Sequence, residues 1–333
     1  MHIAIYLPLA IPVLAALAAR LVADRLPPAA ASWLLTASAL ALALASSAVL
    51  GLLALSALIR LPVVDAAGHL SRPVISRGDA VSVPVAVIAG GVLAAVVAAA
   101  ARALWRRGTA IAAAYRRSRA LPGVGEVVIT EDAAADAYTI PGLPCRIVIT
   151  QGMLRALPGA ERDVLLAHER AHARNSHYLF TSVARLAAAA NPLLRPVAAE
   201  VGYTVERWAD ERAAGATGDR ALAARAIARA ALASSAAPPV RDAALAALGM
   251  TGATHAVSGQ PGTRRGPVSR LDRLRGLGPG PVPRRIAALL APPPRRSLLL
   301  VAAALLLVVV SGASALEAAR NLHQLIELAQ GQG

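Results

Sequence analysis

The sequence predicts an α+β membrane protein, with about four transmembrane helices and a mainly helical cytoplasmic domain that carries a small β-sheet. Of the 333 residues, 56% are hydrophobic and only 3% are aromatic, and the mean hydropathy is +0.56. Ordinary soluble proteins do not have this balance. Four segments are apolar over about 20 residues, the length of a membrane-spanning helix. Between the third and the fourth lie about 190 residues, enough for one domain with its own core.

The four apolar segments predict four membrane spans, at about 3–23, 33–59, 81–104 and 297–316. The first contains Pro8 and Pro12, which membrane helices tolerate when neighbouring groups satisfy the freed carbonyls. It does not have the basic start of a signal peptide. The alternative is that these segments are alanine-rich helices of a soluble core. That alternative is strongest for the third segment.

Arginines cluster on one side of the third and fourth spans, and they predict the orientation. The residues are Arg102, Arg106, Arg107, Arg116, Arg117, Arg119, Arg284, Arg285, Arg295 and Arg296. By the positive-inside rule, residues from about 105 to 296 are cytoplasmic and both termini are outside, in a multi-pass protein of the cell membrane. Three arginines in the loop 60–80 disagree with this orientation, which places that loop outside. We expect the denser clusters beside the third and fourth spans to decide the orientation.

The net charge of +15 is then mostly charge at the membrane surface. Direct nucleic-acid binding is the competing explanation of so basic a chain. We do not expect it, because the arginines lie beside membrane spans or in Pro/Gly-rich stretches without interleaved aromatic residues. The single cysteine, Cys145, excludes an intrachain disulfide and is expected to be a small buried residue of a strand.

These patterns divide the chain into five parts. We expect a membrane domain at 1–104, a cytoplasmic domain at 105–235, a Pro/Gly/Arg-rich loop with an amphipathic segment at 236–296, a fourth transmembrane helix at 297–316 and a short extracellular tail at 317–333.

Within the cytoplasmic domain, residues 125–130 and 145–150 are rich in β-branched residues and predict strands. Residues 137–142 form either a third, edge strand that Pro141 ends or a short connector. An edge strand could pair with the extended backbone of a substrate.

Helices are expected at about 151–176, 178–190, 198–216 and 219–233. The apolar stretch 178–194 is short and interrupted by Arg185, and it predicts a buried or interfacial helix. Residues 284–290 predict a short amphipathic helix on the domain or on the bilayer.

The motif HExxH is the most informative feature of the expected cytoplasmic domain. His168 and His172 are four residues apart, so on a helix they share one face and can hold one metal ion. Glu169 follows the first histidine, where it can accept a proton from the attacking water. Pro158 and Gly159, followed by acidic residues, predict a turn and a helix N-terminus just before the motif.

A second motif, ExxxD, supplies the remaining carboxylates. Glu206 could complete a site of two histidines and one glutamate for one Zn²⁺ per chain, with the fourth position free for water. That arrangement is typical of catalytic rather than structural zinc. Asp210 lies one helical turn after Glu206.

Taken together, the chain resembles the BlaR/MecR-type membrane metallopeptidases, relatives of the HtpX-type and CAAX prenyl proteases among the gluzincins. The resemblance rests on the stretches IVITQGMLRALPGAERDVLLAHERAH, ERWADERAA and RRIAALL, together with the pattern of spans. It implies a zincin-like domain in which His168, His172 and Glu206 bind zinc and Glu169 is the general base. It also implies that Asp210 orients a ligand histidine.

The chain departs from this group in two ways. The position five residues after the second histidine, commonly aspartate in the group, is His177 here. The penicillin-binding sensor is missing, since the residues after the last span contain no Ser-x-x-Lys, so direct sensing of β-lactams is not expected.

The expected function is zinc-dependent endoproteolysis of proteins at the cytoplasmic membrane face. The substrate could be a transcriptional repressor of the BlaI/MecI type or a membrane protein in quality control. The oxyanion needs a donor besides zinc, and Tyr203, Arg212 and His177 are the candidates.

Two other functions remain open. In a non-proteolytic signal transducer the metal domain would be structural or sensing, and the intact Glu169 argues against this. A membrane transporter or scaffold is disfavoured because the proposed spans contain no Asp, Glu or Lys.

Overall fold

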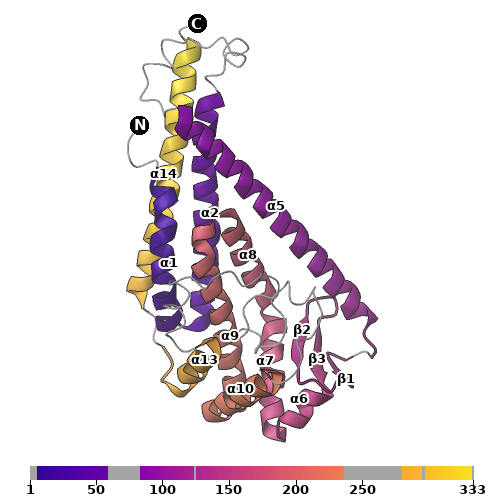
Figure 1. The fold of residues 1–333 in the computed structure, drawn as a ribbon. Helices are drawn as coiled ribbons and strands as arrows, with labels where there is room; N and C mark the ends of the chain where they lie inside the picture. Colours follow the sequence, from indigo (N-terminus) through magenta and orange to yellow (C-terminus); the bar gives the residue numbers. More distant parts are fainter. Residues whose placement is uncertain (1–5, 59–82, 124, 236–279, 295–296, 332–333) are drawn as a thin grey trace, which may run out of the picture.

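The structure is a computed structural model that describes residues 6–58, 83–123, 125–235, 280–294 and 297–331 (Figure 1). In chain order its elements are α1 (Leu7–Arg25), α2 (Pro28–Leu58), α5 (Val83–Ala120), β1 (Val127–Thr130), β2 (Ala137–Ile140), β3 (Arg146–Thr150), α6 (Gln151–Ala156), α7 (Gly159–Arg174), α8 (His177–Ala190), the 3₁₀ turn η2 (Pro192–Leu194), α9 (Arg195–Thr217), α10 (Arg220–Ser235), α13 (Pro281–Leu290) and α14 (Leu298–Gly331). The architecture is mostly helical with one small sheet, which confirms the α+β expectation.

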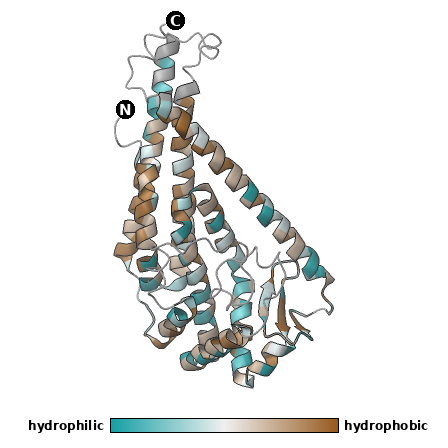
Figure 2. Cartoon of the chain, in the orientation of Figure 1, coloured by the Kyte–Doolittle hydropathy of each residue, from teal (hydrophilic) through white to brown (hydrophobic). Residues whose placement is uncertain are grey.

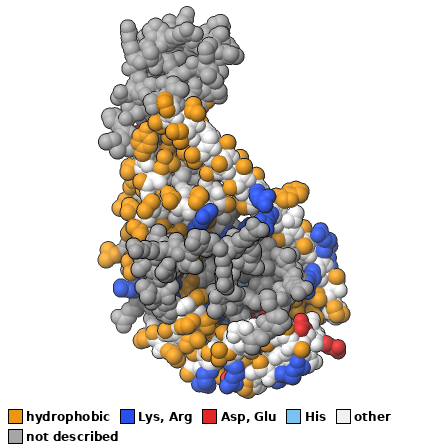
Figure 3. Space-filling view, viewed as in Figure 1, with side chains coloured by type: hydrophobic (Ala, Val, Ile, Leu, Met, Phe, Trp, Pro, Cys, Tyr) orange, Lys and Arg blue, Asp and Glu red, His pale blue; other side chains and the backbone are white. Residues whose placement is uncertain are grey.

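Four helices among the described residues are long and apolar enough to cross a membrane: Leu7–Arg25, Pro28–Leu55, Pro84–Ala120 and Leu298–Asn321. They correspond to the four expected spans, including the third. In Figure 1, α1, α2 and α14 run side by side in the upper part, and α5 leaves them diagonally toward the sheet. Apolar side chains cover the described upper surface, whereas arginines gather lower down (Figures 2 and 3).

Two helices continue beyond the ends expected from hydropathy. The third span was expected to end near 104, but α5 runs without a break to Ala120. The last was expected to end at 316, but α14 runs to Gly331. Hydropathy marks where a segment stops being apolar, whereas alanine and arginine favour helix on both sides of that point. The predicted loop at 60–80 and most of the Pro/Gly/Arg-rich segment, 236–279, lie outside the described residues.

The sheet has the order β1–β3–β2, with β1 parallel and β2 antiparallel to β3. The third expected strand is therefore present, at an edge as predicted. All four residues of β2 are buried, and β2 packs against α7. This contact places one edge of the sheet beside the helix that carries HExxH.

The helix expected over about 151–176 is two helices, α6 and α7. Leu157 has an extended backbone and Pro158 caps α7, because a residue that precedes proline is driven out of the helical region. The acidic start expected from the sequence is present, since Glu161 lies in the first turn of α7. After the turn at Pro158, α7 starts at Gly159, nine residues before His168, and the motif lies in the helix interior.

Helices α8 and α9 connect the membrane helices to the domain. A core cluster joins apolar residues of α1 and α2 to Phe180, Val201 and Trp208 on these two helices. Polar bonds cross the same contact: Arg207 Nη1 donates to the carbonyl of Ala23 at 2.6 Å. The 14-residue α8 is not among the four span candidates, in line with the buried helix expected there.

Candidate metal centre

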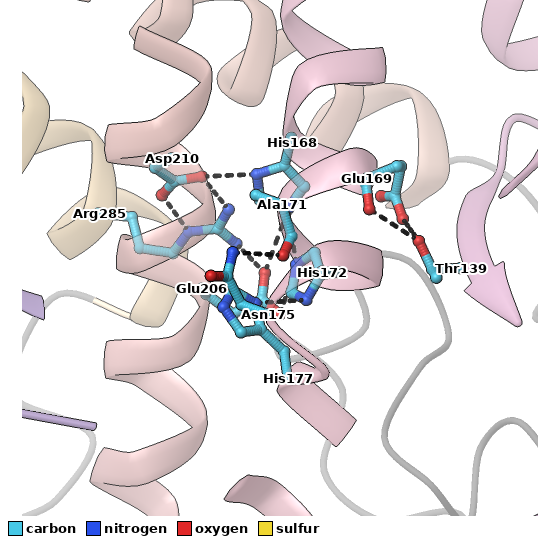
Figure 4. A network of polar contacts seen from close by, with 10 residues as sticks. All are labelled: Thr139, His168, Glu169, Ala171, His172, Asn175, His177, Glu206, Asp210 and Arg285. Carbon is cyan, nitrogen blue, oxygen red and sulfur yellow. Dashed lines mark hydrogen bonds and ion pairs between the residues drawn. The ribbon is translucent and has the colours of Figure 1, made fainter. Parts of the chain in front are cut away.

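Three side chains predicted to bind metal converge between α7 and α9. His168 and His172 project from successive turns of α7, and Glu206 faces them from α9 (Figure 4). One ligand atom from each lies within 4.8 Å of the others. The two Nε2 atoms are 3.1 Å apart, and Glu206 oxygens lie 3.7 Å from His168 Nε2 and 3.6 Å from His172 Nε2.

The chemistry of this donor set fits a zinc ion. Tetrahedral ligands at about 2.0–2.1 Å from zinc are about 3.3–3.4 Å from one another, close to the observed separations. Two imidazole nitrogens and a carboxylate point at one spot. An ionised carboxylate has no proton to donate, so the three groups cannot all be hydrogen-bonded to one another. A cation at that spot would satisfy all three groups.

His168 is held from behind by a carboxylate. Its Nδ1 lies 3.0 Å from Asp210 Oδ1, and the Asp210 side chain is 1% exposed. Burial disfavours the charged form of His168, but the Asp210 carboxylate outweighs it, so that the pKa of His168 is raised. The proton on Nδ1 faces Asp210, which leaves the Nε2 lone pair directed at the cluster.

Arg285 of α13 binds both carboxylates of α9. Its Nε and Nη2 donate to Asp210 at 2.7 and 2.6 Å, and its Nη1 lies 3.0 Å from Glu206 Oε2. Burial opposes the ionised form of Asp210, but Arg285 and His168 hold the pKa of Asp210 well below its ordinary value. The planar guanidinium therefore fixes two carboxylates that come one helical turn apart.

His172 is held from behind by another imidazole. Its Nδ1 lies 3.1 Å from Nδ1 of His177, which is only 1% exposed. Burial lowers the pKa of His177 to about 3. Burial also lowers the pKa of His172 well below its ordinary value, with the neighbouring His168 adding to the effect. Both rings are therefore neutral.

Glu169 is buried and points to the sheet. Thr139 of β2 donates its hydroxyl to Glu169 Oε2 at 2.9 Å and to the Glu169 carbonyl at 3.0 Å (Figure 4). Burial raises the pKa of Glu169, which makes its carboxylate a stronger base. The carboxylate is thus fixed beside the cluster without belonging to it.

The structure places the three candidate oxyanion donors differently. The ring of Tyr203, three residues before Glu206, lies under the guanidinium of Arg284, with 3.7 Å from Cζ to the ring centroid. Arg212 is exposed on α9. His177 lies behind His172, with its Nε2 buried.

Comparison with known proteins bears on this centre. Residues 98–193 match the family model of Peptidase family M48. No curated protein and no solved structure matches the chain. The matched residues run from the middle of α5 to η2 and include HExxH, but they end before Glu206 and Arg285.

This match supports a relationship to the M48 zinc metallopeptidases and indicates a metallopeptidase, a hydrolase of peptide bonds. It covers under a third of the chain and does not address the finer resemblance to the BlaR/MecR type. The M48 similarity and the convergence of His168, His172 and Glu206 point to the same kind of site.

Arg285 and Thr139 were not among the residues predicted for the site. The stretch RRIAALL was noted as an amphipathic segment, and α13 does dock on α9 and α10 with Val282, Arg285 and Leu289 buried. The spacing of these three residues indicates one apolar face that includes an arginine. An arginine on a buried face needs an acidic partner, so this spacing could have predicted that Arg285 meets a carboxylate.

Proposed function

We propose that this protein is a membrane-embedded zinc endopeptidase that cleaves proteins at the cytoplasmic face of the membrane. The observation that carries the proposal is the convergence of His168, His172 and Glu206, with Glu169 one residue from the first histidine. A site that served only to hold zinc would need no base beside it.

Zinc, when bound, would polarise the scissile carbonyl and make a water molecule acidic enough to react near neutral pH. Glu169 accepts the proton of the attacking water as the oxygen bonds to the carbonyl carbon, and it passes that proton to the amide nitrogen as the C–N bond breaks. Thr139 holds the Glu169 carboxylate at one oxygen and leaves the other for the water. Tyr203 and Arg212 are the candidate donors to the oxyanion.

The edge strand β2 supplies a place for the substrate backbone. It lies at the edge of the sheet opposite β1 and contacts the motif helix through Thr139. An extended peptide that adds to this edge would run past Glu169, held mainly by main-chain hydrogen bonds. Such binding has little dependence on side chains, so it suits an enzyme that cleaves protein segments exposed near the bilayer.

The substrate class proposed from the family resemblance is a regulatory protein, a transcriptional repressor of the BlaI/MecI type. The attachment of the centre to the membrane helices supports substrates that come to the membrane. Arg284, next to Arg285, pairs with Asp24 at the end of α1 at 2.8 Å and with Glu200 of α9 at 2.9 Å. The metal centre and the end of the first span are thus parts of one network.

The decisive comparison is Glu169→Gln against His172→Ala, in membranes that contain the full-length chain. We expect Glu169→Gln to keep about one zinc per chain and to lose cleavage of a co-expressed repressor and of labelled casein. His172→Ala should lose both zinc and cleavage. Cleavage that persists in Glu169→Gln would exclude the peptidase mechanism, and zinc content unchanged in both His172→Ala and Glu206→Ala would exclude the site.

The proposed orientation has its own test. Reporters fused at Pro261 and at Gly333 should read cytoplasmic and extracellular, respectively. A cytoplasmic reading at Gly333 would mean that an odd number of the four predicted membrane spans is wrong.

A further inference from the structure

The turn between α7 and α8 brings His177 back toward the metal centre. Helix α7 ends at Arg174 and α8 begins at His177, with Ser176 in the left-handed region at φ 49° and ψ 45°. If α7 simply continued, residue 177 would lie about 140° around the helix axis from His172. The reversal at Ser176 instead places Nδ1 of His177 at 3.1 Å from Nδ1 of His172.

The His177 ring is fixed by its surroundings. It is 1% exposed and lies 4.7 Å from the Trp208 ring and 4.8 Å from the His172 ring, centroid to centroid. The ring of Phe180 lies 6.4 Å away. Packing between aromatic rings fixes the plane of the imidazole, and the nitrogen of that ring that meets His172 is Nδ1.

We infer that His177 is a positioning residue that accepts a hydrogen bond from His172 Nδ1–H and so fixes the tautomer and ring angle of His172. The inference rests on the proposed function, because it takes His172 Nε2 as the metal-binding atom. If the Nε2 lone pair is directed at the ion, the proton of the neutral ring must be on Nδ1. The lone pair 3.1 Å away belongs to His177 Nδ1, so the proton of His177 is on Nε2.

A neutral acceptor at this position has a physical reason. Glu206, Asp210 and Glu169 already bring three carboxylates to the centre, and Arg285 binds two of them with a single positive charge. A fourth carboxylate at 177 would bind His172 more strongly, because charge-assisted hydrogen bonds are roughly twice as strong as neutral ones. It would also add a buried negative charge to the metal-free protein, where no ion offsets it.

Four variants of the full-length, detergent-purified chain test this. His177→Phe keeps an aromatic ring against Trp208 but has no acceptor. His177→Asn keeps an acceptor near the place of Nδ1, whereas His177→Gln carries its amide near the place of Nε2. His177→Asp adds the carboxylate common at this position in the related group. Ser176→Gly, one residue away, is the matched control.

Zinc affinity, measured by competition with a chelator, should fall about 10-fold or more in the Phe and Gln variants. It should stay close to wild type in the Asn and Ser176→Gly variants and should equal or exceed it in the Asp variant. The Asp variant should also be the least stable of the set without metal. Cobalt substituted for zinc should give the wild-type visible spectrum in the Asn variant and a shifted spectrum in the Phe variant, since only the latter frees the His172 ring.

Wild-type zinc affinity and cobalt spectrum in His177→Phe would overturn the inference and make His177 a packing residue. An Asn variant as weak as the Phe variant would also overturn it, because the acceptor would then not matter. Either result would leave the zinc site intact in the wild type. A wild-type chain that binds no zinc would overturn the proposed function as well.

Discussion

His168 and His172 lie one turn apart on the same helix, yet their Nδ1 atoms, which face away from the metal centre, meet different groups. Nδ1 of His168 faces Asp210, a carboxylate that Arg285 fixes with two hydrogen bonds. Nδ1 of His172 faces His177, a neutral ring held by packing against Trp208. A charged group thus faces one histidine, and a neutral group faces the other.

The two supports also come from different parts of the chain. His177 follows His172 by five residues, and a local turn together with packing on Trp208 places it. Asp210 and Arg285 come from α9 and α13, and α13 leads directly into the last membrane helix α14.

The largest effect is expected from Arg285→Met, which removes the guanidinium from the buried Asp210 and the partly exposed Glu206. Breaking a buried ion pair in this way typically costs about 3–5 kcal/mol of the free energy of unfolding. Chemical unfolding of the metal-free protein in detergent measures it. Arg284→Met, at the adjacent position, is the matched control and should lose less, because its partners Asp24 and Glu200 are 41% and 16% exposed, whereas Asp210 is 1% exposed. Equal losses in the two variants would contradict the role given to Arg285.

The second prediction compares the two supports directly. Asp210→Asn keeps the size of the side chain but replaces the carboxylate that faces His168, and it should weaken zinc binding by about 10–100-fold. The loss should exceed that of His177→Phe, since an ionic acceptor is stronger than a neutral one. The double variant should depart from the simple product of the two losses, because both residues act on ligands of the same ion. A larger loss in His177→Phe than in Asp210→Asn would reverse the comparison.

Local spacing predicts which candidate ligands share a helix face, but not that α7 and α9 meet. His168 and His172 share a face because they are four residues apart, and Glu206 and Asp210 do so for the same reason. The structure brings all four together, with Asp210 behind His168. The spacing equally allows Asp210 to pair with a nearby arginine on its own helix, Arg207 or Arg212. Arg207 instead donates to the backbone of α1.

The supports could not be predicted in the same way. Arg285 is 75 residues from Asp210 in the chain, and its place on the apolar face of α13 does not reveal which carboxylates it meets. Thr139 reaches Glu169 because β2 pairs with β3 and packs on α7, which is a property of the tertiary fold. The position of His177 depends on Ser176 adopting a left-handed conformation, which serine rarely does. Sequence spacing therefore specifies contacts within a helix, and packing decides the rest.

A third prediction concerns the base rather than the ligands. Thr139→Val keeps the shape of the side chain and removes the hydroxyl that binds the Glu169 carboxylate. Loss of one hydrogen bond to a charged group is worth about 1.5 kcal/mol, so kcat should fall about tenfold. Zinc affinity should not change, because Thr139 touches none of the three ligands. An unchanged kcat, measured with labelled casein at saturating concentration, would show that Glu169 is oriented by other contacts.

The smallest effect is expected from Ser176→Gly. This variant tests the turn that places His177 beside His172. Serine at φ 49° pays a backbone cost that glycine does not, while glycine loses more entropy on folding. The two terms nearly cancel, so the free energy of unfolding should change by less than about 1 kcal/mol. Zinc affinity should stay at the wild-type level, since the turn that returns His177 to His172 is kept. Ser176→Pro differs, because its fixed φ near −65° cannot form this turn, and it should lower zinc affinity as His177→Phe does. If Ser176→Pro bound zinc like the wild type, the reversal after α7 would not be what positions His172.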